Sequence, residues 1–79
     1  MNVTVKLHTT LKKFAPEGTR GGVVPLELQD GATAKTAVEA LEIPEDFVGA
    51  VFLGAQRSEL DSPLTDGVEV NLLAPIGGG

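Results

Sequence analysis

The chain has 79 residues, of which 42% are hydrophobic and 22% are charged, so we expect one small folded domain and no disorder. It contains no cysteine, which excludes a disulfide framework, a thiolate zinc site and a nucleophilic thiol. Its net charge is −5, and residues 38–79 carry Arg57 alone against eight acidic side chains. This distribution argues against nucleic-acid or membrane binding and favours a basic protein partner, although solubility alone explains it as well.

The first ten residues alternate apolar and polar side chains, which predicts a strand over residues 2–9 with one buried face. They contain no uninterrupted apolar run of the kind found in a signal peptide, so we expect a cytoplasmic protein.

A second strand is predicted after a glycine-rich loop at residues 18–22, because Val24, Leu26 and Leu28 alternate with polar residues and proline. It is expected to form a hairpin with the first strand. Pro25 cannot donate to a ladder, which places this strand at a sheet edge.

A helix of about ten residues is predicted next. Thr33 stands at the N-cap position, and the residue pair Ile43-Pro44 is expected to end the helix, because the residue before a proline avoids the α region. The apolar residues at helical spacing are Ala34, Ala37, Val38 and Leu41.

The remaining elements are strands. Residues 48–53 predict a third strand, a turn at residues 54–55 leads to a short fourth strand at 56–59, and the last strand is expected at 68–73. One helix over a mixed sheet of four or five strands is an α+β domain with two layers. Phe14 and Phe47 are expected to close the ends of its core. The predicted core consists of Val3, Val5, Leu7, Val24, Leu26, Leu28, Ala37, Val38, Leu41, Val51, Leu53, Val68, Val70 and Leu72.

Residues that could support catalysis or metal binding are sparse. His8 is the only histidine and has no partner at a catalytic spacing, so it is interpreted as a surface residue. The carboxylate pairs at residues 45–46 and 59–61 lack the further ligands of a calcium loop. The glycine-rich loop lacks the lysine of a phosphate loop. We therefore expect no catalytic residue, no metal site and no enzyme activity.

The C-terminal sequence LLAPIGGG divides the chain into a domain at residues 1–73 and a flexible tail at 74–79. Pro75 stiffens the start of the tail. Pro75 is assigned a role in recognition of the tail through its fixed φ. A narrow enzyme channel can close around backbone that has no Cβ, which gives a recognition role to Gly77 and Gly78. The tail, about 20 Å long when extended, then presents the α-carboxylate of Gly79. The alternative is an idle glycine end.

The order ββαββ followed by Gly-Gly resembles the ubiquitin-like β-grasp sulfur carriers of the MoaD/ThiS type, which include the molybdopterin synthase small subunit and the thiazole-forming sulfur carrier. The resemblance covers the whole chain. It rests on LKKFAP after the first strand, DGATAKTAVEAL at the helix, IPEDFVGAVFLG at the third strand and, most specifically, LDSPLTDGVEVNLLAPIGGG at the end.

The resemblance implies a sulfur-transfer cycle. An E1-like adenylyltransferase, using ATP and magnesium, adenylates the carboxylate of Gly79. A sulfurtransferase or cysteine desulfurase then supplies a persulfide that replaces AMP and leaves a thiocarboxylate. A synthase subunit finally accepts the sulfur. The chain itself is expected to bind no cofactor.

Three functions remain open. The first is a sulfur carrier: the LKKFAP region and the chain length are similar to the molybdopterin branch, which is preferred, whereas the triple glycine is common in the thiazole branch, and a carrier for another sulfur-containing metabolite is a further alternative. The second is a ubiquitin-like protein modifier, in which Gly79 forms isopeptide bonds with lysines. The third is a noncovalent interaction domain with an idle tail.

Phe52 and Leu73 are the candidate docking residues. The period of two places both side chains on the sheet face opposite the core, where large apolar groups indicate a contact surface. If the third and last strands are neighbours, the two side chains touch. The alternative is isolated surface hydrophobics.

Overall fold

The structure is a computed structural model that describes residues 1–75. Five strands, one α-helix and two 3-10 helices follow each other along this part of the chain. In chain order they are β1 (Asn2–Leu7), η1 (Thr9–Phe14), β2 (Val23–Glu27), α1 (Ala34–Ala40), η2 (Glu45–Phe47), β3 (Ala50–Leu53), β4 (Gln56–Ser58) and β5 (Glu69–Leu73).

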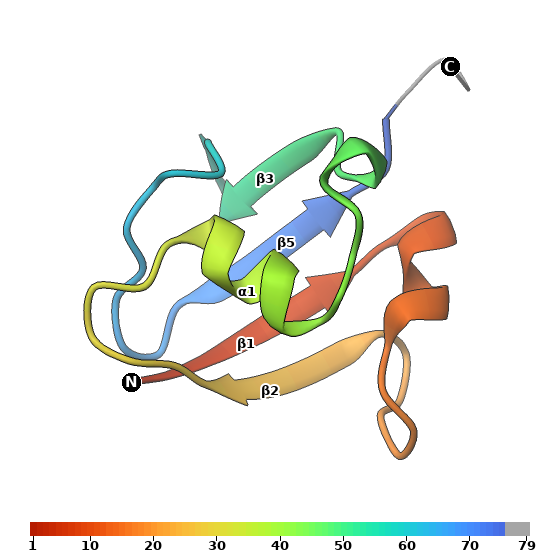
Figure 1. Cartoon of the computed structure of the whole chain (residues 1–79), viewed down its shortest axis with the longest axis horizontal. Coiled ribbons are helices and arrows are strands. Elements are labelled where there is room, and N and C mark those ends of the chain that lie inside the picture. The colour runs from red at the N-terminus through yellow and green to blue at the C-terminus, as the bar shows by residue number, and fades with distance from the viewer. Residues whose placement is uncertain (76–79) are drawn as a thin grey trace.

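The strands form one mixed sheet in the order β2-β1-β5-β3-β4. β5 pairs parallel with β1 and antiparallel with β3, and the two outer pairs are antiparallel. Figure 1 shows α1 lying across one face of this sheet. The fold is therefore α+β and of the ubiquitin-like β-grasp type, as the order of elements predicts. Pro25 lies on the edge strand β2, as expected.

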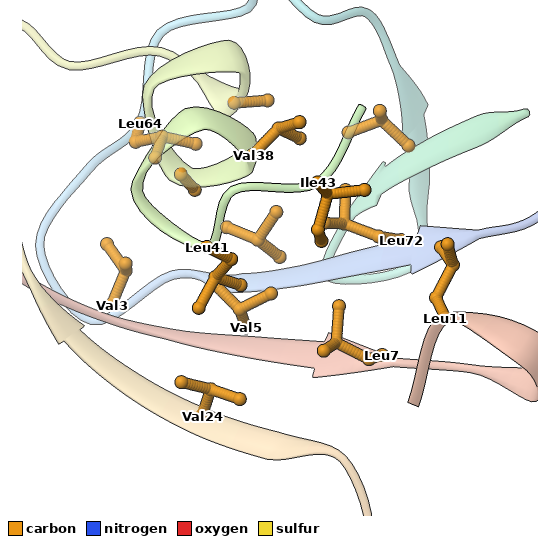
Figure 2. Close-up of a cluster of buried hydrophobic side chains, with 14 residues drawn as sticks. Val3, Val5, Leu7, Leu11, Val24, Val38, Leu41, Ile43, Leu64 and Leu72 are labelled. Carbon is orange, nitrogen blue, oxygen red and sulfur yellow. The ribbon is translucent and has the colours of Figure 1, made fainter. Parts of the chain in front are cut away.

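The core lies between α1 and the sheet (Figure 2). Ten residues of the predicted set are buried, and the other four pack against them while only partly buried, because they lie on an edge strand or next to strand ends. These four are Leu26, Leu28, Leu53 and Val68. The sequence interpretation omitted Leu11, Ala34, Ile43 and Leu64, all of which are buried.

The first strand is shorter than predicted, because it ends at Leu7 and the chain turns at Thr9, whose φ is 54°. The predicted strand included His8 and Thr9, whereas η1 starts at Thr9. This turn allows Leu11, which is 0% exposed, to reach the core. The burial of Leu11 favours this turn, so the strand ends two residues earlier than predicted.

The helix is also shorter than the predicted ten residues, because α1 ends at Ala40. Its end is a Schellman motif: the Ile43 N–H donates to the Val38 carbonyl at 3.1 Å, and the Glu42 N–H donates to the Glu39 carbonyl at 3.0 Å. Glu42 occupies the left-handed position of this motif with φ 57°. The helix therefore ends at this motif, and the prediction that the Ile43-Pro44 pair ends it is wrong.

The start of α1 agrees with the prediction that Thr33 is the N-cap. The Thr33 N–H donates to the Thr36 hydroxyl at 3.0 Å, so a threonine supplies the reciprocal bond of the capping box. None of the helices in the described part of the chain has the length and apolar character needed to cross a bilayer.

Candidate functional site

The described chain leaves the sheet at the end of β5, a strand held on both sides. Val70 and Leu72 on its inner face are both 0% exposed, and the registers pair Leu72 with Leu7 on β1 and with Val51 on β3. The central position of the strand means that two ladders fix its direction. Figure 1 shows β5 running toward the C-terminal side of the molecule, where η1 and η2 also lie.

Gly49 holds the chain where it leaves the sheet. Its N–H donates to the Leu73 carbonyl at 2.7 Å. A Cβ on Gly49 would lie 2.6 Å from the Pro75 nitrogen and 2.9 Å from the Ala74 carbonyl carbon, closer than side chains tolerate. Only glycine therefore allows residues 74 and 75 to pass this closely over the start of β3.

This arrangement bears on the predicted tail. Ala74 packs against the core cluster and is partly buried, whereas Pro75 is exposed. The tail residues Gly77, Gly78 and Gly79, to which recognition and activation were assigned, lie outside the described residues. Their roles, and the division of the chain at residue 73, stay predictions.

Phe52 and Leu73 lie at diagonal positions on the open face of the sheet, because Phe52 pairs with Asn71 and Ala50 pairs with Leu73. Both side chains are partly exposed and line a hollow of about 480 Å³. The Arg57 guanidinium lies 5.9 Å from the Phe52 ring centroid. The two predicted docking residues therefore share one surface, while docking itself stays a prediction.

Polar side chains of β5 and of His8, which follows β1, border this hollow. The His8 Nε2 donates to the Asn71 Oδ1 at 3.0 Å, and the Asn71 amide donates to the Gly54 carbonyl at 3.3 Å. His8 is thus engaged in the surface of the sheet, which fits the surface interpretation.

The ion pair next to His8 joins the Lys6 Nζ to the Glu69 Oε2 at 2.8 Å. The hydrogen bond from Lys6 lowers the pKa of the Glu69 carboxyl from its ordinary value. Glu69 therefore stays ionised at neutral pH, and the border of the hollow carries charges that largely neutralise each other.

A second group of side chains lies near Pro75. It consists of Lys13, Phe14 and Phe47, and we call it the aromatic–lysine cluster. The two phenyl rings meet edge to face, with centroids 5.6 Å apart. The Lys13 ammonium lies 5.4 Å from the Phe14 centroid and 5.1 Å from the Phe47 centroid. A hollow of about 370 Å³ separates this cluster from Pro75, and its lining includes Phe47 and Pro75.

This cluster corrects an expectation from the sequence. Phe14 is partly buried against the core, as predicted, but Phe47 is 41% exposed and does not close it. Phe47 lies in η2, which the sequence interpretation treated as a link, and its ring makes a T-shaped contact with the Phe14 ring. No group of three or more metal-ligating side chains exists among residues 1–75.

Two features of the site were missed by sequence reasoning. Gly49 was included in a strand, although an isolated glycine in a strand pattern is a known sign of close backbone approach. Lys13 was not selected, because nothing local links it to Phe47, which lies 34 positions later.

The family model described as Mut7-C ubiquitin matches residues 1–75. No curated protein matches the sequence. A crystal structure of the small archaeal modifier SAMP1 from Haloferax volcanii superposes with a TM-score of 0.75 at 20% identity over 100% of both chains.

A second structure of that Haloferax protein gives a TM-score of 0.73 at 19% identity, over 95% of this chain and 98% of that chain. A Pyrococcus furiosus protein described as a candidate molybdopterin converting factor, subunit 1, gives 0.72 at 20% identity, over 96% of this chain and 99% of that chain. At these identities the structures show a shared fold. The family model shows that the chain belongs to the Mut7-C ubiquitin family, and the structural likeness agrees with its ubiquitin-like β-grasp fold.

Proposed function

We propose that this protein is a sulfur carrier whose reactive group is the α-carboxylate of Gly79. The observation that supports this most is the exit from the sheet: β5 lies between two strands, and Gly49 holds Leu73 and Pro75 in one place. A fixed exit followed, after Ile76, by three glycines suits delivery of backbone into the active site of another protein. The proposal requires that Gly79 is the last residue of the protein in the cell.

The chemistry belongs to partner enzymes. An E1-like adenylyltransferase uses ATP and magnesium; a carboxylate oxygen of Gly79 attacks the α-phosphate, and pyrophosphate leaves. The terminal sulfur of a persulfide then attacks the acyl carbon and AMP leaves. A thiol cleaves the resulting acyl disulfide, which yields the thiocarboxylate and a new disulfide. The carrier contributes the carboxylate and its position, and it performs no catalysis itself.

The sulfur acceptor that fits best is a synthase subunit of molybdopterin formation. The likeness to the Pyrococcus protein supports this pathway, while a thiazole synthase is the alternative acceptor. Complementation of strains deficient in molybdopterin or in thiazole synthesis separates the two, since a carrier restores only the pathway it serves.

Intact mass spectrometry tests the proposal. The protein isolated from its source should have the mass of a chain ending at Gly79. Incubation with ATP, magnesium, the E1-like enzyme of that source and a sulfur donor should then shift the mass by one oxygen-to-sulfur exchange. A variant with one alanine added after Gly79 is the control and should show no shift. An unchanged mass for the wild-type chain overturns the proposal.

A protein modifier is the second candidate, supported by the likeness to SAMP1. Both functions use the same activation step. The modifier function predicts adducts joined to target lysines in cell extracts, which disappear when Gly79 is deleted. Thiocarboxylate formation without such adducts supports the carrier function alone.

A further inference from the structure

Two surfaces flank the exit of β5, the open sheet face with Phe52 and Leu73 and the aromatic–lysine cluster with Phe47. We infer that the aromatic–lysine cluster is a second contact surface for the activating enzyme, which meets it with an apolar pocket for Phe47 and carboxylates for Lys13. This inference rests on the proposed function and identifies the chemistry of the partner at the same site.

The reach of the chain requires contact near the exit. Four residues follow Pro75, and they extend at most about 14 Å when fully stretched. An enzyme that reacts with Gly79 must therefore bring its surface against the residues around Pro75. The hollow next to Pro75 is lined by Thr10, Asp46 and Phe47, so the cluster borders the region that the enzyme must cover.

Exposure supports a binding role for Phe47. Phe47 and Val23 are the exposed large hydrophobic residues in the described part of the chain. Phe47 keeps its ring in place through the edge-to-face contact with Phe14 and the nearby Lys13 ammonium. A side chain that is held before binding loses little conformational entropy on association, which favours it as an anchor.

Charge indicates the chemistry of the partner. The last turn of η1 carries Lys12 and Lys13, and its first turn carries no acid. Over residues 1–75 the ion pairs of the structure involve other cations, so neither lysine has a carboxylate within ion-pair distance there. Asp46 lines the same hollow and is the one acid on its rim. On a chain with net charge −5, these two lysines attract carboxylates of a partner.

The test is ATP–pyrophosphate exchange by the E1-like enzyme of the source organism, with the full chain as the varied substrate. Lys13→Glu and Phe47→Ser should each raise KM about tenfold and leave kcat unchanged, because they remove binding that is equal in ground and transition states. Lys13→Arg should restore the wild-type KM. Added salt should raise KM for the wild type and have less effect on Lys13→Glu.

The matched control is Arg20→Glu, which makes the same charge change in the loop before β2. Figure 1 shows that loop on the side of β2, away from the end of β5. Its KM should stay at the wild-type value. Thermal unfolding of each variant separates binding from loss of fold.

Suppose that the wild-type chain supports exchange and that Lys13→Glu and Phe47→Ser, both folded, have the wild-type KM. This result overturns the inference and leaves the proposed function standing. An equal rise in KM for Arg20→Glu also overturns it, because net charge then explains the effect. Absence of exchange with the wild-type chain overturns the proposed function and this inference together.

Discussion

At the scale of single residues, Gly49 decides where the chain leaves the sheet. In Gly49→Ala the new Cβ would lie 2.6 Å from the Pro75 nitrogen, so residues 74 and 75 must move. We expect a loss of about 1–3 kcal/mol in unfolding free energy and a lower rate of Gly79 adenylation. Urea unfolding and pyrophosphate exchange measure the two effects.

Val24→Ala is the control for Gly49→Ala, since Val24 is buried on the edge strand β2 and its loss creates a cavity there. It should lower stability while adenylation of the folded protein stays normal. Equal adenylation of both variants would show that the close approach of Gly49 and Pro75 has no role in presenting the tail.

Glu42 is the second informative residue, because it holds φ 57° at the end of α1. A left-handed conformation costs a residue with a Cβ about 1–2 kcal/mol, and glycine avoids this cost. Glu42→Gly should therefore raise the unfolding free energy by about 1 kcal/mol. Glu39→Gly, in the last turn of α1, should lower the unfolding free energy by up to about 1 kcal/mol. A loss of stability in both variants would contradict the explanation.

At the scale of elements, the Lys6–Glu69 ion pair connects β1 with β5 across their parallel ladder. Lys6 lowers the pKa of Glu69 in the folded state, so the pair stabilises the fold above the unfolded pKa of the carboxyl. This contribution is lost as the pH falls through the lowered folded pKa.

The expected pH dependence is a difference between variants. Wild type should exceed Glu69→Gln in unfolding free energy at neutral pH, and the difference should vanish near pH 2, a value at about which most carboxyls are protonated. Urea unfolding at a series of pH values measures it. A difference that does not change with pH assigns the effect of Glu69 to packing.

The elements also show what sequence patterns can predict. Local patterns of alternation, apolar runs and turn residues located every strand within about two residues. The period of two also placed Phe52 and Leu73 on the same face, because it is a local property. It could not locate η1, since a 3-10 turn that buries Leu11 has no such period. The contacts of Gly49 with Pro75 and of Lys13 with Phe47 depend on tertiary packing, which no local pattern encodes.

At the scale of the whole molecule, the small core makes each buried side chain important. A domain of this size is stable by roughly 4–12 kcal/mol. Leu11→Ala, at a fully buried position, should cost about 2–5 kcal/mol and lower the melting temperature sharply. Phe47→Ala, at an exposed position, should cost much less; equal losses in denaturant unfolding would contradict the assignment of Leu11 to the core.

The central place of β5 has a consequence for the order of folding. Both strands that bond to it precede it in the chain, and its parallel partner β1 lies more than sixty residues earlier, so the sheet cannot close until the last strand has been synthesised. Such distant pairing is slow to form. A full-length molecule in which β5 has not yet paired with β1 and β3 has no fixed exit at Gly49. Under the proposed function, it would offer an activating enzyme a poorly placed carboxylate, so activation of Gly79 would act as a check on folding.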